Sequence, residues 1–409
     1  MTVPHRSPIA VLGAGVRTPA GNTVDELWEN LCAATATAER FEDDRLPVGA
    51  LALACRVLDF DPASVLTPIE ARRLDRSHAL AFAAAQEALD QCGDLPPPER
   101  RAVVCGVGLP AATTYEQQWT QLMTGGVRAV TPLLIPLVMP STIASHLSIR
   151  FDLQGPCLTV SAACASGAAA IAEGVELLRR GAADLVLAGG VDSLVTYGPM
   201  CGFIRLDAMS RNVDRPELAS RPFDVDRDGF VMGEGAGFVV LTRAADARVG
   251  DGLGLVLGHA STADAHHLVA PAPDGRGALR CMSLALADAG IDAADVAHVN
   301  AHGTSTVLND LVEAQALAAL LDGSSAPVTA VKGSTGHMIG ASGAVEAIVS
   351  LAAIGHGLVP PVTGLRTVDP ACSIDVVHDR PREVPAGPVL SNSFGFGGTN
   401  TVLVLGPPA

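Results

Sequence analysis

Lysine is nearly absent from this sequence of 409 residues. Lysine and arginine together number 27, and Lys332 is the single lysine, so every other basic side chain of that total is an arginine. Both residues serve as solvated surface charges, but the lysine ammonium is a compact cation with three donors, whereas the arginine guanidinium is a planar fork. The one retained lysine therefore indicates a position that requires a compact cation, an interpretation that depends on its neighbours.

Positive charge is scarce overall. Acidic residues number 43 against 27 basic ones, the formal net charge is −16, and the isoelectric point is near 5.0. This balance argues against a nucleic-acid-binding protein, which would carry a basic surface. Charged residues make up only 17 % and hydrophobic residues 48 %, so the chain can bury a large core. Its length suffices for two domains, or for one built from two similar halves.

Several common patterns are missing. The nine cysteines contain no C-x-x-C pair of the kind that forms zinc or redox sites. The most apolar stretch, residues 132–140, is interrupted by Pro136 and is too short to span a bilayer. The N-terminal residues lack the apolar core and cleavage site of a signal peptide. We therefore expect no metal site, no membrane contact, and a reducing, cytoplasmic location.

Short apolar strands alternate with helical stretches along the whole chain, which is typical of a layered α/β protein. Strands are predicted at residues 8–13, 101–106, 182–189, 237–241 and 296–299, and helices at residues 25–32 and 80–91.

A weak internal repeat divides the chain. Ala165-Ser-Gly-Ala begins a helical run in the first half, and Ala341-Ser-Gly-Ala begins one in the second. Each half also ends on a similar apolar strand. These parallels predict two duplicated α/β halves, residues 1–250 and 251–409, with the break in the glycine-rich connector around residue 250.

Cys164 is a candidate nucleophile. It lies where a predicted strand turns into a helix that runs to Arg180, and the small residues after it allow a tight bend. The positive end of that helix would point at the sulfur and lower the pKa of the thiol. Because most cysteines are buried and inert, an ordinary core cysteine is an equally good interpretation of this segment alone.

Two histidines occupy matching positions in the second half. His302 follows a short strand and precedes a helix, so it would lie at a strand end that faces a crevice. His337 lies five residues after Lys332 in a glycine-rich loop that also leads to a helix. On the helix after His302, Asp310 and Glu313 share a face, and one of them could pair with Lys332; a solvated acidic face is the alternative for Asp310.

A last glycine-rich segment, residues 391–400, contains Phe396 between glycines that permit positive φ angles and close backbone approach. Such a loop can aim N–H groups at an oxyanion, although an ordinary turn would use similar residues.

Taken together, these segments resemble the β-ketoacyl-acyl-carrier-protein synthases, members of the thiolase-fold superfamily, over nearly the whole chain. The motifs that carry the resemblance are Val11-Leu-Gly-Ala-Gly, Arg72-Arg-Leu-Asp-Arg, Ala162-Ala-Cys-Ala-Ser-Gly, Ala188-Gly-Gly-Val-Asp, Arg227-Asp-Gly-Phe-Val-Met-Gly-Glu-Gly, Asn300-Ala-His-Gly-Thr-Ser-Thr, Lys332-Gly-Ser-Thr-Gly-His and Gly395-Phe-Gly-Gly-Thr-Asn. The resemblance implies an αβαβα arrangement of the two halves.

The resemblance also implies roles for matching residues. Cys164 would accept the acyl chain, and His302 and His337 would hold a malonyl thioester and stabilise the enolate formed on decarboxylation. Lys332 would orient His337, with Glu313 in support. The backbone N–H groups of Cys164 and Phe396 would form the oxyanion hole. Thr304 and Thr306 would contact the phosphopantetheine arm, and Phe203 and Phe396 would be gates of the acyl tunnel.

The Cys–His–His set resembles elongating synthases of the type II fatty acid or polyketide kind. The resemblance implies acyl carrier protein as the partner that delivers both substrates, no metal or organic cofactor, and a homodimer or a heterodimer with a chain-length-factor-like subunit. Arginines would dock the carrier, with these as candidates: Arg72, Arg73, Arg76, Arg128 and Arg211.

Three other functions compete with this one. A Cys–His hydrolase would use Cys164, His302 and an asparagine such as Asn392, but it would leave His337 and Lys332 without a role. A non-condensing partner subunit would not need the complete Cys–His–His–Lys set. A malonyl decarboxylase would need the histidines but not Cys164.

Overall fold

The computed structural model describes residues 7–43, 45, 52–247, 252–324 and 326–408. The elements of the first half are β1 (Ile9–Arg17), α1 (Val24–Cys32), β2 (Glu39–Phe41), β3 (Ala52–Cys55), α2 (Arg76–Asp90), β4 (Arg101–Gly106), α3 (Ala112–Gly125), α4 (Leu134–Val138), α5 (Thr142–Phe151), β5 (Cys157–Val160), α6 (Ser166–Arg179), β6 (Leu185–Ser193), α7 (Tyr197–Arg205) and β7 (Met232–Arg243).

The elements of the second half are β8 (Gly254–Ala263), α8 (Arg276–Ala289), β9 (His298–Asn300), α9 (Val307–Leu321), β10 (Val328–Thr329), α10 (Lys332–Thr335), α11 (Ser342–His356), β11 (Leu358–Val359), β12 (Arg382–Glu383), β13 (Val389–Gly395) and β14 (Thr399–Gly406). The predicted strands and helices are present in these positions. The helix expected from residue 80 begins earlier, because the carboxylate of Asp75 caps it by accepting the N–H of Ser77.

The strand order confirms the duplication. The main sheet runs β10-β9-β13-β14-β8-β1-β7-β6-β4-β5, so the order read outward from β8 matches the order read outward from β1. In each half the first three strands pair antiparallel and the outer three pair parallel. The halves join where β1 pairs with β8 over Ile9–Val11. The expected break near residue 250 falls within residues 248–251, outside the described residues.

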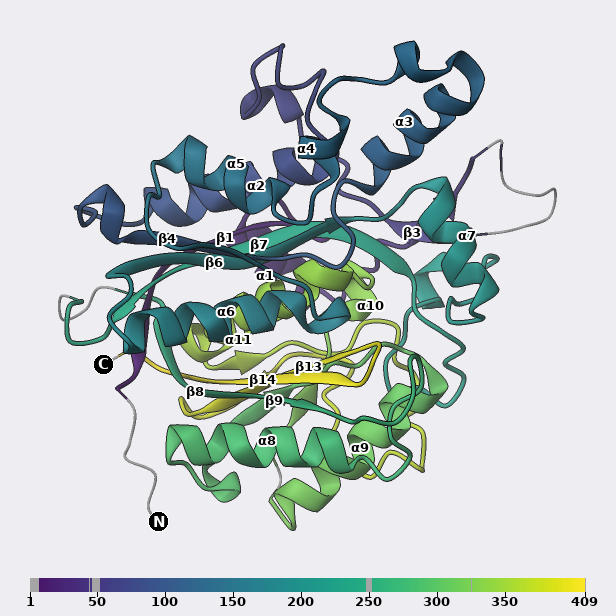
Figure 1. Ribbon diagram of the computed structural model, residues 1–409. Coiled ribbons are helices and arrows are strands. Elements are labelled where there is room, and N and C mark those ends of the chain that lie inside the picture. The colour runs from purple at the N-terminus through teal and green to yellow at the C-terminus, as the bar shows by residue number, and fades with distance from the viewer. Residues whose placement is uncertain (1–6, 44, 46–51, 248–251, 325, 409) are drawn as a thin grey trace.

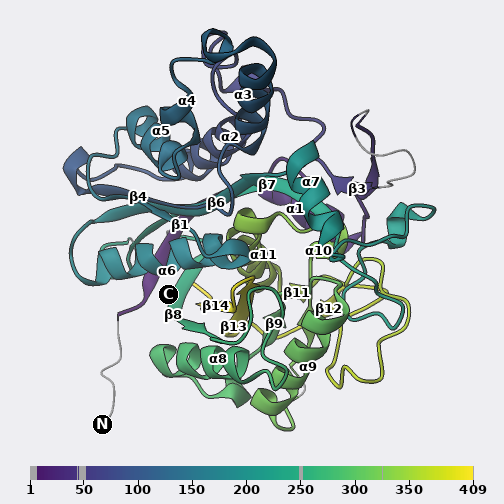
Figure 2. The same ribbon diagram turned by 45° about the vertical axis from the view of Figure 1, so that its right-hand side comes forward.

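Five layers build the molecule. Figure 1 shows α2 and α5 above the strands of the first half, α8 and α9 below those of the second half, and α6 and α11 side by side between them. Figure 2, turned by 45°, shows the same central pair of helices between the two groups of strands. The structure therefore has the expected αβαβα arrangement.

The central helices pack closely because glycines lie where they cross. A Cβ on Gly167 of α6 would lie 3.0 Å from the Cβ of Ala344, and one on Gly343 of α11 would lie 2.9 Å from the Cβ of Ala168. The contact is reciprocal, as expected for two copies of one unit related by an approximate two-fold axis. It brings the starting ends of both helices to the middle of the molecule.

One helical stretch among the described residues, Ile339–His356, has the length and apolarity of a membrane span, and 83 % of it is buried inside the protein. It contains α11, one of the two central helices. Its apolar sequence is explained by its place in the core.

Candidate active site

Cys164 lies at a sharp turn between β5 and α6. The turn is a short 3₁₀ segment, Ala163–Ala165, in which Ala163 adopts the left-handed conformation with φ 50°. The Ser166 hydroxyl stabilises the bend, since it accepts the N–H of Ala162 at 2.9 Å and donates to the carbonyl of Ala163 at 2.6 Å. Cys164 is 5 % exposed and lines a cavity of the protein.

The second half repeats this turn at Ile339–Ala341. Ile339 has φ 47°, Gly340 stands where the first half has Cys164, and Ser342 stands where it has Ser166. The repeated turn carries no nucleophile, but it holds His337, whose Nδ1 lies 3.2 Å from the Ser342 hydroxyl.

The structure brings three predicted side chains to one point. The Cys164 sulfur and nitrogens of His302 and His337 all lie within 4.8 Å of one another. The two imidazole rings are 5.5 Å apart at an interplanar angle of 81°, and both residues are buried. Cys164 comes from the first half and the histidines from the second, so the site exists only where the halves meet. By spacing alone, these same three groups could also hold a metal ion.

Lys332 uses its three donors on two residues. Its ammonium lies 2.5 Å from the carbonyl of His302 and 3.3 Å from Nδ1 of the same histidine, and it also pairs with the carboxylate of Glu346. The expectation that Lys332 orients His337 is therefore wrong, because the hydrogen bonds of the Lys332 ammonium run to His302 and Glu346. The need for a compact cation with three donors fits these contacts.

Glu313 and Asp310 do not pair with Lys332. The Glu313 carboxylate accepts the N–H groups of His302 and Gly303 at 2.8 and 2.9 Å, so it supports the loop that carries His302. It also accepts the side-chain amide of Asn392 at 3.1 Å. Asn392 is thereby held away from the cavity that contains Cys164, and it does not occupy the third position that a Cys–His hydrolase would require.

The thiol is not acidified at rest, contrary to the expectation from the helix N-terminus. Burial raises the pKa of Cys164 to about 11, while the N–H of Phe396 and the charge of Lys332 act in the opposite direction. Burial wins because the sulfur is enclosed by apolar side chains that cannot solvate a thiolate.

Both histidines are neutral at physiological pH. Burial lowers the pKa of His302 well below its usual value, and the nearby charge of Lys332 lowers it further. The pKa of His337 is lowered well below its usual value by the same two causes. Since the Lys332 ammonium donates to Nδ1 of His302, the ring proton of that histidine must lie on Nε2.

The loop with Phe396 closes over the nucleophile. The backbone N–H groups of Phe396 and Cys164 both hydrogen-bond to the Cys164 sulfur and lower the pKa of the thiol. A Cβ on Gly395 would lie 2.7 Å from the carbonyl of Ala162 and 3.2 Å from the nitrogen of Cys164, so only glycine allows this close approach. Two backbone N–H donors therefore lie beside the sulfur, and their role as an oxyanion hole stays a prediction.

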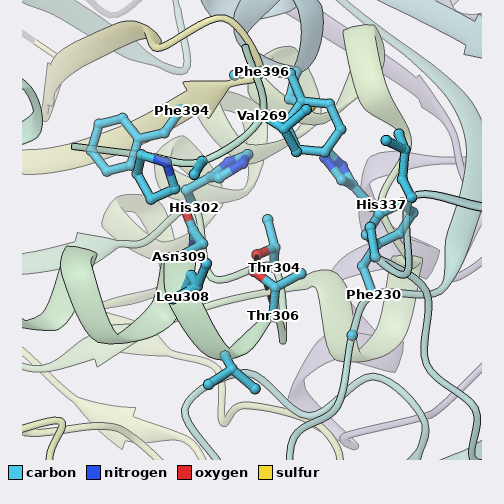
Figure 3. A pocket seen from close by; sticks show the side chains of 18 of the residues that line it. Phe230, Val269, His302, Thr304, Thr306, Leu308, Asn309, His337, Phe394 and Phe396 are labelled. Carbon is cyan, nitrogen blue, oxygen red and sulfur yellow. Dashed lines mark hydrogen bonds between the residues drawn. The ribbon is translucent and has the colours of Figure 1, made fainter. Parts of the chain in front are cut away.

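A cavity of about 360 Å³ leads to these groups. The predicted residues Phe203, Thr304 and Thr306 all line it, and the two threonine hydroxyls are 2.9 Å apart. Figure 3 shows His302 on the left and His337 on the right of the cavity, with Thr304 and Thr306 below them. The ring centres of Phe203 and Phe396 are 6.3 Å apart.

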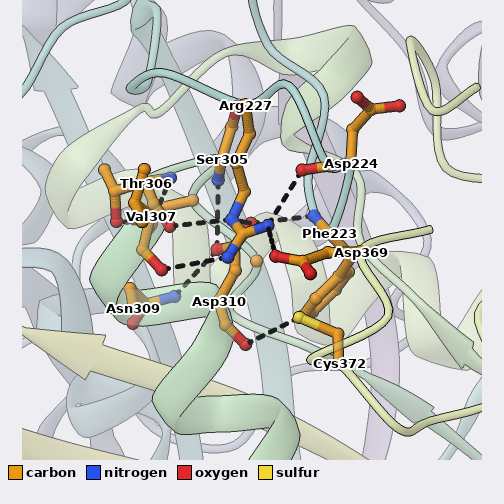
Figure 4. A network of polar contacts seen from close by, with 12 residues as sticks. Phe223, Asp224, Arg227, Ser305, Thr306, Val307, Asn309, Asp310, Asp369 and Cys372 are labelled. Carbon is orange, nitrogen blue, oxygen red and sulfur yellow. Dashed lines mark hydrogen bonds and ion pairs between the residues drawn. The ribbon is translucent and has the colours of Figure 1, made fainter. Parts of the chain in front are cut away.

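A buried polar network fixes the threonine loop (Figure 4). Arg227 pairs with Asp369 at 2.7 Å and lies 3.7 Å from Asp310, and it donates to the carbonyl of Val307 at 3.0 Å. Asp310 in turn accepts the N–H of Ser305 at 3.2 Å. The network thus ties the start of α9 to a distant loop.

Sequence reasoning missed Glu346, Arg227 and Asp192. Each could have been found from the sequence. Glu346 is the only charged residue in the apolar run of α11, and Arg227 and Asp192 lie in two of the motifs that carry the family resemblance. Asp192 accepts the N–H groups of Gly108 and Gly340 at 2.8 and 2.7 Å and so connects the two halves. Burial raises the pKa of its carboxyl to about 6.

The arginines proposed for carrier docking differ in their surroundings. Arg76 is engaged in an ion pair with the buried Glu234 at 2.8 Å, and Arg211 pairs with Asp207 on the surface. Arg72, Arg73 and Arg128 are exposed. Arg76 is therefore the weakest of these candidates for contact with a partner.

Comparison with known families agrees with the fold and with the arrangement of the site. Residues 6–247 match the model of the beta-ketoacyl synthase N-terminal domain, and residues 253–366 match that of the C-terminal domain. The chain belongs to the beta-ketoacyl synthase family. It is accordingly an acyltransferase of the condensing type. The boundary expected at residue 250 stays a prediction.

Individual relatives are similar over nearly the whole chain. Two curated proteins named 3-oxoacyl-[acyl-carrier-protein] synthase 2 are each 37 % identical: one from Synechocystis sp., with 98 % of each chain covered, and one from Staphylococcus aureus, with 97 % of each covered. A solved ketosynthase in complex with a type II polyketide acyl-carrier protein is 26 % identical with a TM-score of 0.89, covering 99 % of this chain and 100 % of that one. The ishigamide ketosynthase/chain length factor is 32 % identical with a TM-score of 0.88 at the same coverage.

Proposed function

We propose that this protein catalyses decarboxylative Claisen condensation between an acyl group held on Cys164 and a malonyl thioester, with both substrates delivered by acyl carrier protein. The observation that carries the proposal is the meeting of the Cys164 sulfur, two neutral imidazoles and two backbone N–H donors at the end of one cavity. The names of the relatives support the carrier as partner.

In the first step the Cys164 sulfur attacks the carbonyl carbon of the acyl thioester. The carbonyl oxygen becomes an oxyanion that accepts the N–H groups of Cys164 and Phe396. The carbon–sulfur bond to the carrier then breaks, and the carrier thiol leaves with the proton that the cysteine lost. One well-placed donor to such an oxyanion typically lowers the barrier by about 3–4 kcal/mol.

In the second step the malonyl thioester replaces the departed carrier. Its carbon–carbon bond to the carboxylate breaks, carbon dioxide leaves, and the electron pair moves into an enolate whose oxygen accepts N–H bonds from His302 and His337. The enolate carbon attacks the acyl carbon on Cys164, and a new carbon–carbon bond forms. The carbon–sulfur bond to Cys164 breaks, and the departing thiolate takes up a proton from solvent, which restores the neutral thiol. Neutral imidazoles suit this step because they donate hydrogen bonds without protonating the carbanion.

Lys332 acts on this chemistry through His302. By donating to Nδ1 it fixes the tautomer in which Nε2 carries the proton that the enolate needs. Ser342 can do the same for His337. No step requires a metal or organic cofactor. We expect chelation to leave the rate unchanged, and stoichiometric bound metal whose removal abolishes activity would contradict this.

Mass spectrometry of the enzyme and of the carrier tests the proposal. An acyl-carrier-protein thioester should add the acyl mass to Cys164, and malonyl carrier should then yield a β-ketoacyl carrier longer by two carbons. Cys164→Ala should abolish condensation while decarboxylation can persist, and Cys157→Ser, at an exposed thiol, is the matched control. Absence of acylation by every donor would favour the non-condensing partner subunit. The cytoplasmic location also stays a prediction, which fractionation of the native cells can test.

A further inference from the structure

Ile339 has an unfavourable backbone conformation for its residue type. Its φ is 47°, in the left-handed region that glycine and asparagine tolerate and that β-branched residues rarely adopt. The residue is 5 % exposed. An isoleucine kept in this conformation, beside a reaction centre, calls for a functional explanation.

The surrounding hydrogen bonds hold the conformation from both sides. On one side, the N–H of His337 donates to the carbonyl of Val231 at 2.7 Å, and the carbonyl of His337 accepts the N–H of Gly233 at 2.9 Å. These two hydrogen bonds attach the segment before Ile339 to the start of β7. On the other side, the N–H of Gly340 donates to Asp192 at 2.7 Å. The backbone of Ile339 therefore has little freedom to relax.

The first half shows that this backbone shape does not require a large side chain. Ala163 occupies the matching position before Cys164, with φ 50°. Alanine is sufficient there, so the isoleucine in the second half is explained by what its side chain contacts. A Cβ on Gly108 would lie 2.6 Å from Cγ2 of Ile339, which shows how closely the side chain packs on that side.

On its other side Ile339 lines the cavity together with Cys164. Both belong to one apolar cluster that also contains Met200, Met209 and Met232. Those methionines are not among the residues that line the cavity. Isoleucine is stiff because its Cβ is branched, so Ile339 gives the cavity wall near Cys164 a fixed shape.

We propose that Ile339 is a specificity-determining residue that excludes acyl groups branched at the carbon next to the thioester carbonyl. This inference rests on the proposed function. With the carbonyl oxygen directed at the N–H groups of Cys164 and Phe396, the next carbon of the acyl group extends to the opposite side, toward apolar side chains that contact the sulfur. A methyl branch there meets Ile339, while branches farther along the chain lie beyond it.

Three isomeric five-carbon acyl groups test the proposal as pantetheine thioesters: pentanoyl, 3-methylbutanoyl and 2-methylbutanoyl. The kcat/KM of Cys164 acylation is measured for each by intact-protein mass spectrometry. The wild-type protein should accept the first two and discriminate against the third. Ile339→Ala and Ile339→Gly should each reduce that discrimination by about tenfold or more, since one methyl group is worth roughly 10–200-fold in a close-fitting site.

Two controls separate the specificity effect from a general disturbance. Ile339→Val keeps the branched Cβ and should keep the discrimination. Leu308→Ala removes an exposed side chain at the mouth of the same cavity and should also leave it unchanged. Melting temperatures establish that the variants fold, and the glycine variant suits the left-handed backbone even if alanine does not.

The outcomes distinguish the two proposals. Unchanged discrimination in folded Ile339→Ala and Ile339→Gly, with normal acylation by pentanoyl thioester, would overturn the specificity role and leave the condensation proposal standing. Failure of every thioester, and of acyl carrier protein, to acylate the wild-type protein would overturn the condensation proposal itself.

Discussion

Cys164 combines a position suited to nucleophilic attack with a protonation state that opposes it. Its pKa is raised to about 11 by burial, so at pH 8 only about one molecule in a thousand carries the thiolate. The N–H of Phe396 and the charge of Lys332 favour the ionised form without outweighing burial. The site is therefore arranged to stabilise charge that develops during reaction more than charge at rest.

We expect the alkylation of Cys164 by iodoacetamide to rise about tenfold per pH unit from pH 7 to pH 10, because the thiolate fraction rises that way below the pKa. Peptide mapping of the Cys157→Ser variant, which lacks an exposed thiol, measures the rate at this residue alone. An alkylation rate that stops rising below pH 9 would show that the N-terminus of α6 lowers the pKa of Cys164 more than burial raises it.

Lys332 and Glu346 form an ion pair with both side chains 1 % exposed. Glu346→Gln should lower the free energy of unfolding by about 3–5 kcal/mol, because it leaves a buried ammonium without its counterion. The double variant Lys332→Met, Glu346→Gln removes both charges and should recover much of that loss, yet stay inactive because the His302 tautomer is no longer fixed. Chemical denaturation and condensation assays measure the two effects separately.

An exposed ion pair, Arg215 with Glu217, is the control for the buried pair of Lys332 with Glu346. Glu217→Gln removes the partner of Arg215 on the surface, where both side chains are about half exposed, and should change neither stability nor rate appreciably. Recovery of activity in the double variant would contradict the role assigned to Lys332.

At the scale of elements, the start of α9 and the loop before it carry the residues proposed to hold the pantetheine arm. Their position depends on Arg227, which is 5 % exposed and bonded to a carboxylate and to backbone carbonyls. A buried arginine with this many partners fixes a loop well because its donors are held in one plane.

Arg227→Met should raise the KM for carrier-bound or pantetheine-bound acyl donors by about tenfold, since it removes hydrogen bonds to charged partners that are each worth about 1.5–3 kcal/mol. The KM for a short thioester without the arm should change little, because such a donor does not reach Thr304 and Thr306. Arg180→Met, at an exposed position with no proposed contact to the carrier, is the matched control. Equal losses with both donor types would indicate general unfolding of the site.

At the scale of the whole molecule, exposed apolar side chains are concentrated in one stretch of the chain, residues 109–149, which contains α3, α4 and most of α5. They are Leu109, Tyr115, Trp119, Met123, Val127, Leu133, Ile135, Met139 and Ile149. These elements lead into β5, the last strand of the sheet, which pairs only with β4 among the described residues. Exposed apolar side chains beside an open strand edge are typical of an association surface.

We expect the protein to form its dimer, with a second copy or with a chain-length-factor-like subunit, through this stretch of the chain. Ile149→Asp places a charge on α5 at a side chain that is 80 % exposed and should weaken association measurably in analytical ultracentrifugation. Leu284→Asp, on α8 in the layer on the far side of the molecule, is the control and should not. Unchanged association in both would place the interface elsewhere.

The sequence by itself determined the family, the layered α/β class, the duplication and the residues Cys164, His302, Lys332 and His337, because each depends on local patterns: strand-to-helix turns, glycine-rich loops and one lysine among arginines. It did not determine which groups touch. The contact of Lys332 with His302 and Glu346, the raised pKa of the thiol, and the left-handed Ile339 against the cavity come from segments far apart in the chain. Burial and hydrogen bonding between such segments depend on how the two halves pack, and the tertiary structure alone decides that.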